Sequence, residues 1–222
     1  MKRNLLKNIF LSLCLVVFPM GMAAKQEATV TSPSGNLTLT AGVDKAGRPY
    51  YSLSRGKEAI LLPSYLGVKL KDGSLDSDFG VMGFVRTTKD ETWHQPWGEE
   101  NDVRNHYNEL TMKLAQRKGL KRQLTIVFRV FDDGMGFRYV FPEQKNLKHF
   151  VIMDEETEFC FKGDPEAWTL PYDADYYEGL WTKAPLSKKQ KVCTPITIEA
   201  KPDLYMMLHE ANLTDYASLN VK

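Results

Sequence analysis

A His-Glu pair stands where an apolar run ends near the end of the sequence. The stretch "DLYMMLHEANLTDY" places His209 and Glu210 directly after a segment that is typical of a strand. Glutamate is depleted in strands and is seldom buried without a partner. A strand-end carboxylate that faces water is the simplest interpretation. A carboxylate placed there to bind a ligand is the alternative, and the local sequence leaves both open.

A second group of residues has the composition of a sugar-binding surface. The stretch "WHQPWGEENDVRNHYNEL" brings Trp93, Trp97 and Glu99 close together in the sequence. The C–H face of a pyranose packs on an indole ring, and its hydroxyl groups need donors and acceptors nearby. These three residues are therefore candidates to face a substrate. An irregular loop whose tryptophans fill the edge of the core explains the same composition.

Three pairs of adjacent carboxylates are the other candidates for chemistry: Glu99-Glu100, Asp132-Asp133 and Glu155-Glu156. Adjacent residues of a strand point to opposite faces, so these pairs are not expected to converge. Glycosidases need two carboxyl groups that face each other across the scissile bond. The sequence alone identifies no catalytic residue. His94 and His106 have no third ligand at metal spacing, so no zinc site is expected.

The elements that position these residues are expected to be strands almost throughout. "NLTLTAGV" alternates between polar and apolar residues, and "YYSLSR" is its hairpin partner. "QLTIVFRVFDDGMGFRYVF" predicts a hairpin whose turn contains Asp132-Asp133 and Gly134.

Later strands are expected in "HFVIM", "TEFCF", "TPITIEA" and "LYMMLHE". A turn or two around Glu99–Asn105 is the best helical candidate. Many strands at short spacing favour an all-β sandwich or barrel. The loop-rich stretch 164–191 is where a ligand would meet such a scaffold.

The N-terminus has the pattern of a secretory signal peptide. Lys2, Arg3 and Lys7 precede a short apolar run, and cleavage is expected after Ala23 or Ala24. Residues 1–23 are therefore assigned to the signal and 24–222 to one domain. We expect a periplasmic or secreted protein without a membrane span, because the apolar run is shorter than the roughly 20 residues that a span needs.

Charge and cysteine content exclude some functions and leave one question open. Removal of the three basic residues of the signal leaves 26 basic against 28 acidic residues, a net charge of −2. No basic field is left to attract a nucleic acid. Export permits a disulfide between Cys160 and Cys193, but two separate buried thiols are an equally simple interpretation.

The order of the motifs resembles the N-terminal domain of glycoside hydrolase family 97. "SPSGNL", "LGVKL", "WGEE" with "RNHYNEL", "FRVFDDGMGFRYVFP", "TEF" and "LHEANLTDY" follow one another over almost the whole mature chain. The family comprises exported bacterial α-glucosidases and α-galactosidases of Bacteroides-type polysaccharide utilisation. The blocks "RNHYNEL" and "FDDGMGFRY" are the specific ones.

The resemblance implies a fold, a metal and a set of partners. The fold is a β-super-sandwich similar to galactose mutarotase, here lacking its last strands, and its partner is a catalytic (β/α)₈ barrel. The ligand is an α-linked oligosaccharide. A calcium ion sits in the active site of the family, and by the match to "HEA" Glu210 is the ligand that this domain supplies.

We therefore expect a truncated or fragment product that is inactive alone. By the resemblance, the acid, the base or nucleophile and the other calcium ligands belong to the barrel. Two alternatives remain. One is a free-standing carbohydrate-binding module that uses Trp93, Trp97 and the loops of 164–191. The other is a mutarotase-like epimerase, which needs a His acid and a Glu base on facing strands.

Overall fold

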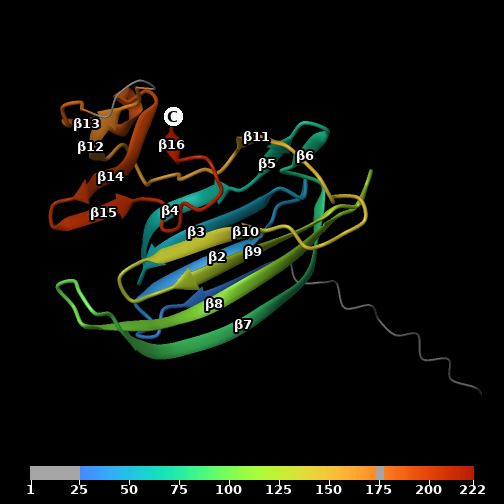
Figure 1. Ribbon diagram of the computed structural model, residues 1–222, viewed down its shortest axis with the longest axis horizontal. Helices are drawn as coiled ribbons and strands as arrows, with labels where there is room; N and C mark the ends of the chain where they lie inside the picture. Colours follow the sequence, from blue (N-terminus) through green and yellow to red (C-terminus); the bar gives the residue numbers. More distant parts are fainter. Residues whose placement is uncertain (1–25, 174–177) are drawn as a thin grey trace, which may run out of the picture.

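The computed structural model describes residues 26–173 and 178–222, so the predicted signal peptide lies outside the described residues. Within them the chain forms sixteen strands and one short 3₁₀ helix, Leu186–Lys188. Two four-stranded sheets, the large sheets of the sandwich, lie face to face, and two further sheets of three and five strands adjoin them (Figure 1). The predicted all-β sandwich is confirmed.

The first large sheet contains the N-terminal strands in chain order, all antiparallel: β1 (Glu27–Thr31), β2 (Leu37–Val43), β3 (Pro49–Arg55) and β4 (Glu58–Tyr65). The alternation in β2 buries Leu37, Leu39 and Ala41, as the sequence predicts. The turn before β2 is closed by the Gly35 amide, which donates to the carbonyl oxygen of Ser32 at 2.9 Å. The sequence pattern and the observed register agree in this sheet.

The second large sheet has the order β10-β9-β8-β7 and contains β7 (Phe79–His94), β8 (Asp102–Gln116), β9 (Gln123–Val130) and β10 (Met135–Val140). Leu124, Ile126 and Phe128 of β9 are fully buried. The Phe131 amide donates to the Gly134 carbonyl oxygen at 2.8 Å, so Asp132 and Asp133 form the turn between β9 and β10. The predicted hairpin is confirmed.

The main core lies between these two sheets. The Tyr51 ring of β3 lies 6.1 Å from the Phe128 ring and 5.5 Å from the Phe137 ring. Full burial of a side chain of this size stabilises the fold by roughly 1.5–3 kcal/mol. One side of the sandwich is closed by polar contacts, because Arg86 donates to the Thr29 carbonyl oxygen at 2.9 and 3.0 Å. This contact covers backbone of the edge strand β1, which would otherwise be free to pair with another chain.

The two further sheets contain the remaining strands of the described chain. One has the order β11-β5-β6 and contains β5 (Val68–Leu70), β6 (Gly73–Leu75) and β11 (Ile152–Glu155). The other has the order β13-β12-β14-β15, with β16 beside β14, and contains β12 (Glu166–Pro171), β13 (Thr182–Pro185), β14 (Val192–Lys201), β15 (Leu204–Leu208) and β16 (Asn220–Val221). Its inner face buries Ala167, Ile196 and Ile198.

The ends of β7 and β8 form a long hairpin, residues 86–110, which we call the arm; it is two-stranded beyond Asn108, the last residue of β8 at this end that still pairs with β9. Its pairs run from Arg86 opposite Leu110 to His94 opposite Asp102. The connecting loop lies beyond the turn that joins β9 to β10 (Figure 1). The helical turn predicted around Glu99–Asn105 is therefore wrong. Apart from Tyr107 and Leu110 at its base, which are buried, the arm carries mostly polar residues on both faces. The sequence therefore shows no regular alternation of apolar and polar residues there.

Two further expectations are settled by the path of residues 157–161. The predicted strand "TEFCF" is wrong as a strand, since this segment forms only an isolated bridge between Phe161 and Leu61. It nevertheless follows the edge of β4, where the Leu62 amide donates to the Cys160 carbonyl oxygen at 2.8 Å. Cys160 and Cys193 are both free thiols, so the interpretation without a disulfide holds.

Candidate functional site

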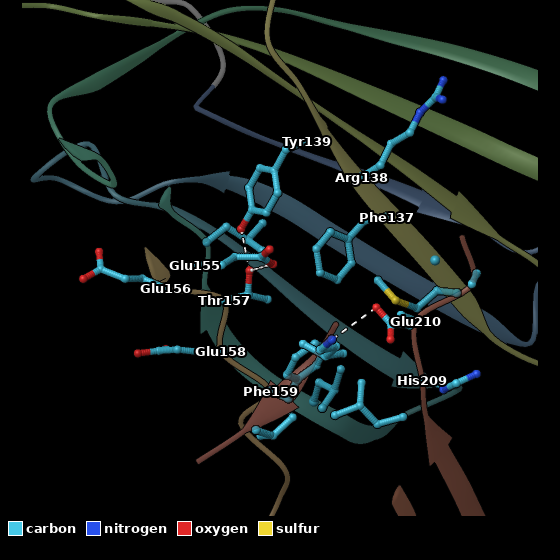
Figure 2. Close-up of a pocket in the computed structure, with 18 of the residues that line it drawn as sticks. Phe137, Arg138, Tyr139, Glu155, Glu156, Thr157, Glu158, Phe159, His209 and Glu210 are labelled. Atoms are coloured by element: carbon cyan, nitrogen blue, oxygen red, sulfur yellow. Dashed lines mark hydrogen bonds between the residues drawn. The ribbon is translucent and has the colours of Figure 1, made fainter. Parts of the chain in front are cut away.

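A broad groove runs along β10 and is bordered by the segment 150–161, by β15 and by residues 209–222. Its volume is about 2790 Å³. Pockets for small molecules have volumes of roughly 300–1,000 Å³. The groove is therefore larger than a pocket for one small ligand. Figure 2 shows its centre, with Phe137 and Tyr139 on one side and Phe159 on the other.

Glu210 lies on the wall of this groove, two residues beyond the end of β15. Leu204, Met206 and Leu208 of β15 face the inner side of the sheet, and the alternation sends His209 outward. Glu210 is half-buried, and its Oε2 accepts a hydrogen bond from the Leu219 amide at 3.2 Å. In Figure 2 the Glu210 carboxylate points into the groove and the His209 ring points away from it. The neighbouring side chains diverge, as the strand geometry predicts.

The chain returns to Glu210 because the loop 211–219 is closed at its far end. Residues Asn220 and Val221 of β16 pair with Cys193 and Val192 of β14. The Thr194 hydroxyl also donates to the Leu219 carbonyl oxygen at 3.1 Å. These contacts hold Leu219 where its amide reaches the Glu210 carboxylate. The orientation of Glu210 thus depends on the closure of this loop.

A chain of hydrogen bonds fastens the same loop to the floor of the groove. Tyr139 Oη lies 2.7 Å from Thr157 Oγ1, and Thr157 Oγ1 donates to Glu155 Oε1 at 2.7 Å. A threonine hydroxyl has a single proton, so Tyr139 is the donor to Thr157. Tyr216 Oη donates to Glu155 Oε2 at 2.8 Å. Glu155 therefore receives one bond from Thr157, which Figure 2 shows, and one from Tyr216 in the loop that carries Leu219.

Burial and charge keep both tyrosines of this chain protonated. Burial raises the pKa of Tyr139 far above its ordinary value of 10. Burial, and then the hydrogen bond to Glu155, raises the pKa of Tyr216. Both phenols consequently remain hydrogen-bond donors at neutral pH. No local motif indicates this network, because Tyr139 and Tyr216 are far in the sequence from Glu155 and Thr157.

The other acidic residues of the groove do not converge on Glu210. Glu156 lies against Asp76. Partial loss of hydration at this contact, followed by the Asp76 charge, raises the pKa of the Glu156 carboxyl. Glu155 and Glu156 face different partners, in line with the expectation that adjacent carboxylates diverge. Within residues 26–173 and 178–222 there is no group of three or more His, Cys, Asp or Glu side chains with the geometry of a metal site. A carboxylate such as Glu210 can serve as one ligand of a hard cation. The Leu219 amide orients it through Oε2.

The three residues predicted to face a substrate lie at the tip of the arm. Trp93 is 55% exposed and Trp97 is 81% exposed. Neither they nor the exposed Glu99 are among the residues that line the groove, so the structure does not bring them together with Glu210. Gln95 closes the loop, because its backbone amide donates to the Asn101 carbonyl oxygen at 2.8 Å and its side-chain Nε2 donates to the Glu100 carbonyl oxygen at 2.6 Å. The arm therefore presents Trp97 on a defined loop.

No helix in the described part of the chain has the length and apolar character needed to cross a membrane.

The comparisons with known proteins agree with one another. The family described as "Glycosyl-hydrolase 97 N-terminal" matches residues 30–222. A retaining alpha-galactosidase of Bacteroides thetaiotaomicron is 28% identical over 229 residues, which cover 96% of this chain and 33% of that protein. A probable retaining alpha-galactosidase of Streptomyces bingchenggensis is 26% identical and covers 82% of this chain and 28% of its own length. The chain thus spans about a third or less of these relatives.

Solved structures show the same relation. A glycoside hydrolase family 97 enzyme of Pseudoalteromonas sp. strain K8, solved as a variant with panose, superposes with a TM-score of 0.82 and 31% identity. The match covers 87% of this chain and 30% of that chain. The same enzyme was also solved with acarbose, with the same agreement. A beta-arabinopyranosidase with a TM-score of 0.76 and 24% identity shows the fold alone.

Proposed function

The chain belongs to the glycosyl hydrolase 97 N-terminal family, and from this premise we propose that it is the non-catalytic N-terminal part of an exported α-glycosidase. Its task is to complete an active site whose acid and base lie on a catalytic (β/α)₈ barrel. The substrate is an α-linked oligosaccharide. The likeness to two α-galactosidases and to an enzyme solved with panose supports this class of substrate without choosing between galactose and glucose.

The proposed contribution of this chain to the active site is the Glu210 carboxylate. The observation that carries it is the position of Glu210 after β15, turned into the groove and oriented by the Leu219 amide at 3.2 Å. Calcium takes roughly six to eight oxygen ligands at 2.3–2.6 Å, and a carboxylate oxygen is its common ligand in proteins. When bound, the ion supplies a positive charge that holds and polarises substrate oxygen atoms. Glu210 would hold the ion as one of its ligands, and the Leu219 amide orients the Glu210 carboxylate.

The surface around Glu210 supports a large partner. Large apolar side chains are exposed among the residues that line the groove: Val151 at 55%, Met153 at 59% and Leu213 at 52%. Exposed apolar side chains gathered along one groove are typical of an interface. We take the catalytic barrel as its occupant, because the solved family enzymes and curated relatives are about three times longer than this chain.

A terbium titration of the 222-residue chain tests the role of Glu210. Terbium takes hard oxygen ligands as calcium does, and its emission is sensitised by nearby aromatic rings. We expect weak sensitised emission that Glu210→Gln abolishes and that Glu99→Gln, a matched change of an exposed acid on the arm, leaves intact. Equal emission from the Glu210→Gln variant and its parent would remove the support for Glu210 as a ligand.

Carbohydrate binding at the arm tip is the second candidate function. The exposure of Trp97 on a loop closed by Gln95 favours it, since a fixed indole face can stack on a pyranose. Affinity electrophoresis in gels with soluble α-glucan distinguishes the two outcomes. Retardation that Trp97→Ala abolishes supports this function, and identical migration with and without glucan rejects it. The epimerase alternative has no support, because His209 and Glu210 diverge.

Export and the absence of activity in isolation complete the proposal. The predicted signal at residues 1–23 supports a periplasmic or secreted location, and N-terminal sequencing of the protein from its native host would show whether cleavage occurs after Ala23 or Ala24. The 222-residue chain alone is proposed to be inactive. Its Glu210 has the Leu219 amide as partner rather than a second carboxyl group across a substrate.

A further inference from the structure

The outer face of the sheet β13-β12-β14-β15 carries a group of side chains that the proposed function does not use. Directly opposed residues of antiparallel strands share a face. Trp168 is opposite Lys183 on one side and Thr197 on the other, and Thr197 is opposite Met207. In the next row Glu166 is opposite Glu199, and Glu199 is opposite Tyr205. We call Glu166, Trp168, Lys183, Glu199, Tyr205 and Met207 the aromatic platform.

The two aromatic rings of the platform lie side by side and are inclined to each other. The ring centroids of Trp168 and Tyr205 lie 6.3 Å apart, and the ring planes are inclined by 40°. Trp168 is half-buried, whereas Tyr205 is 58% exposed and Met207 is 69% exposed. Tyr205 therefore offers the open ring, and Trp168 forms the inclined wall beside it.

Charged groups surround the rings and hold one another in place. Lys183 Nζ lies 2.7 Å from Glu199 Oε2, 2.9 Å from Glu166 Oε2 and 4.4 Å from the centroid of the Trp168 ring. The hydrogen bonds to Glu199 and then to Glu166 raise the pKa of Lys183, so the ammonium group stays charged. Tyr205 Oη is 3.5 Å from Glu199 Oε1. The platform thus has fixed donors and acceptors at the border of two aromatic rings.

We propose that the aromatic platform is a surface site for a neutral oligosaccharide, separate from the tip of the arm and built on the face of β15 that carries Tyr205 and Met207, which also border the Glu210 groove. The C–H faces of pyranose rings would stack on Tyr205 and on the open part of Trp168. Sugar hydroxyl groups would bond to Glu166 and Lys183 at the border. Glu166 and Glu199 share the Lys183 ammonium group, so together they offer hydrogen-bond acceptors and donors to an uncharged ligand. Their charges largely offset one another, so the electrostatic attraction for a charged ligand is weak.

The inclination of the rings favours a curved chain. Coplanar rings suit a flat glycan, whereas rings inclined by 40° suit a chain whose successive sugars turn, as in α-linked glucans. A dry protein interface is a poorer occupant, because its core is depleted of charged residues and would desolvate Lys183 and both glutamates. A glycan keeps these groups hydrogen-bonded. The inference does not require calcium or Glu210.

Calorimetric titration of the 222-residue chain with maltoheptaose tests the platform. We expect binding that Tyr205→Ala and Trp168→Ala each weaken at least about tenfold, which corresponds to about 1.4 kcal/mol. Tyr205→Phe is the matched control, since it keeps the ring and removes only the hydroxyl group, and it should retain affinity to within about twofold. Because Trp168 is half-buried, the melting temperature of each variant is measured, and Tyr205→Ala is the deciding variant.

Each other outcome overturns the proposal. No heat of binding at the highest soluble concentration rejects the site. Binding lost in Trp97→Ala and retained in Tyr205→Ala assigns the sugar to the arm instead. A change of oligomeric state in Tyr205→Ala without sugar binding by the parent makes the platform a protein interface. None of these outcomes bears on the terbium test of Glu210, so the two proposals fail independently.

Discussion

Removal of the Tyr216 hydroxyl should loosen the loop that orients Glu210. In Tyr216→Phe the bond from Oη to Glu155 Oε2, 2.8 Å long, is lost and the ring is kept. A hydrogen bond to a charged group contributes about 1.5–3 kcal/mol when water is excluded. Tyr216 is 48% exposed, so water competes for Glu155 and about 1 kcal/mol is the reasonable magnitude. That amount shifts the opening equilibrium of the loop about fivefold.

Hydrogen exchange at the Leu219 amide measures this opening directly, because that amide donates to Glu210. We expect exchange about fivefold faster in Tyr216→Phe and unchanged exchange at Phe128 in the core. Tyr205→Phe is the control, since its hydroxyl group lies on the outer face of another sheet, 3.5 Å from Glu199. Unchanged exchange at Leu219 in Tyr216→Phe would show that the loop is held without Glu155, and the described route of positioning would be wrong.

Three other changes have defined outcomes. Phe128→Ala removes a fully buried ring and should lower the free energy of unfolding by about 3–5 kcal/mol in a urea titration. Trp97→Ala at the exposed arm tip should change it by less than about 0.5 kcal/mol, and a larger loss would mean that the indole is packed. The folded state binds the Glu156 proton more tightly than the unfolded state does, because the pKa is raised above 4.5. Stability is therefore lost as pH rises through this pKa. Glu156→Gln should melt higher than its parent at pH 7, and the difference should vanish well below the ordinary pKa; a difference that persists in acid would contradict the assignment.

The sequence predicts those parts of the fold whose two faces meet different environments. β2 and β9 each bury alternate residues, so their period of two is visible as apolar residues at every second position. The arm has polar residues on both faces, and its strands are set by cross-strand pairs such as Arg104 with Asp90 at 2.8 Å. Nothing in the local sequence shows those pairs, and a helical turn was expected in their place. "TEFCF" has the composition of a strand, but it lies on the edge of β4 with too few backbone bonds to form one.

The candidate site divides in the same way. The position of Glu210 at a strand end follows from the apolar run before it, and the family motif identifies it. Its surroundings depend on contacts between distant parts of the chain: Tyr216 reaches Glu155 across 61 positions. Tyr139 and Thr157 belong to the same network, and a single sequence contains no signal that pairs them. Trp93 and Trp97 are candidates to face a substrate on sequence grounds, but their separation from the groove follows only from the length of the arm.

A calorimetric titration of the 222-residue chain with calcium tests the central claim most directly. The claim is that this domain supplies one carboxylate, Glu210, to a site whose other ligands lie elsewhere. One carboxylate gives one or two of the roughly six to eight oxygen atoms that calcium takes. We therefore predict binding no tighter than about millimolar. Micromolar binding that Glu210→Gln abolishes would contradict the claim, because the calcium site would then be complete within this chain.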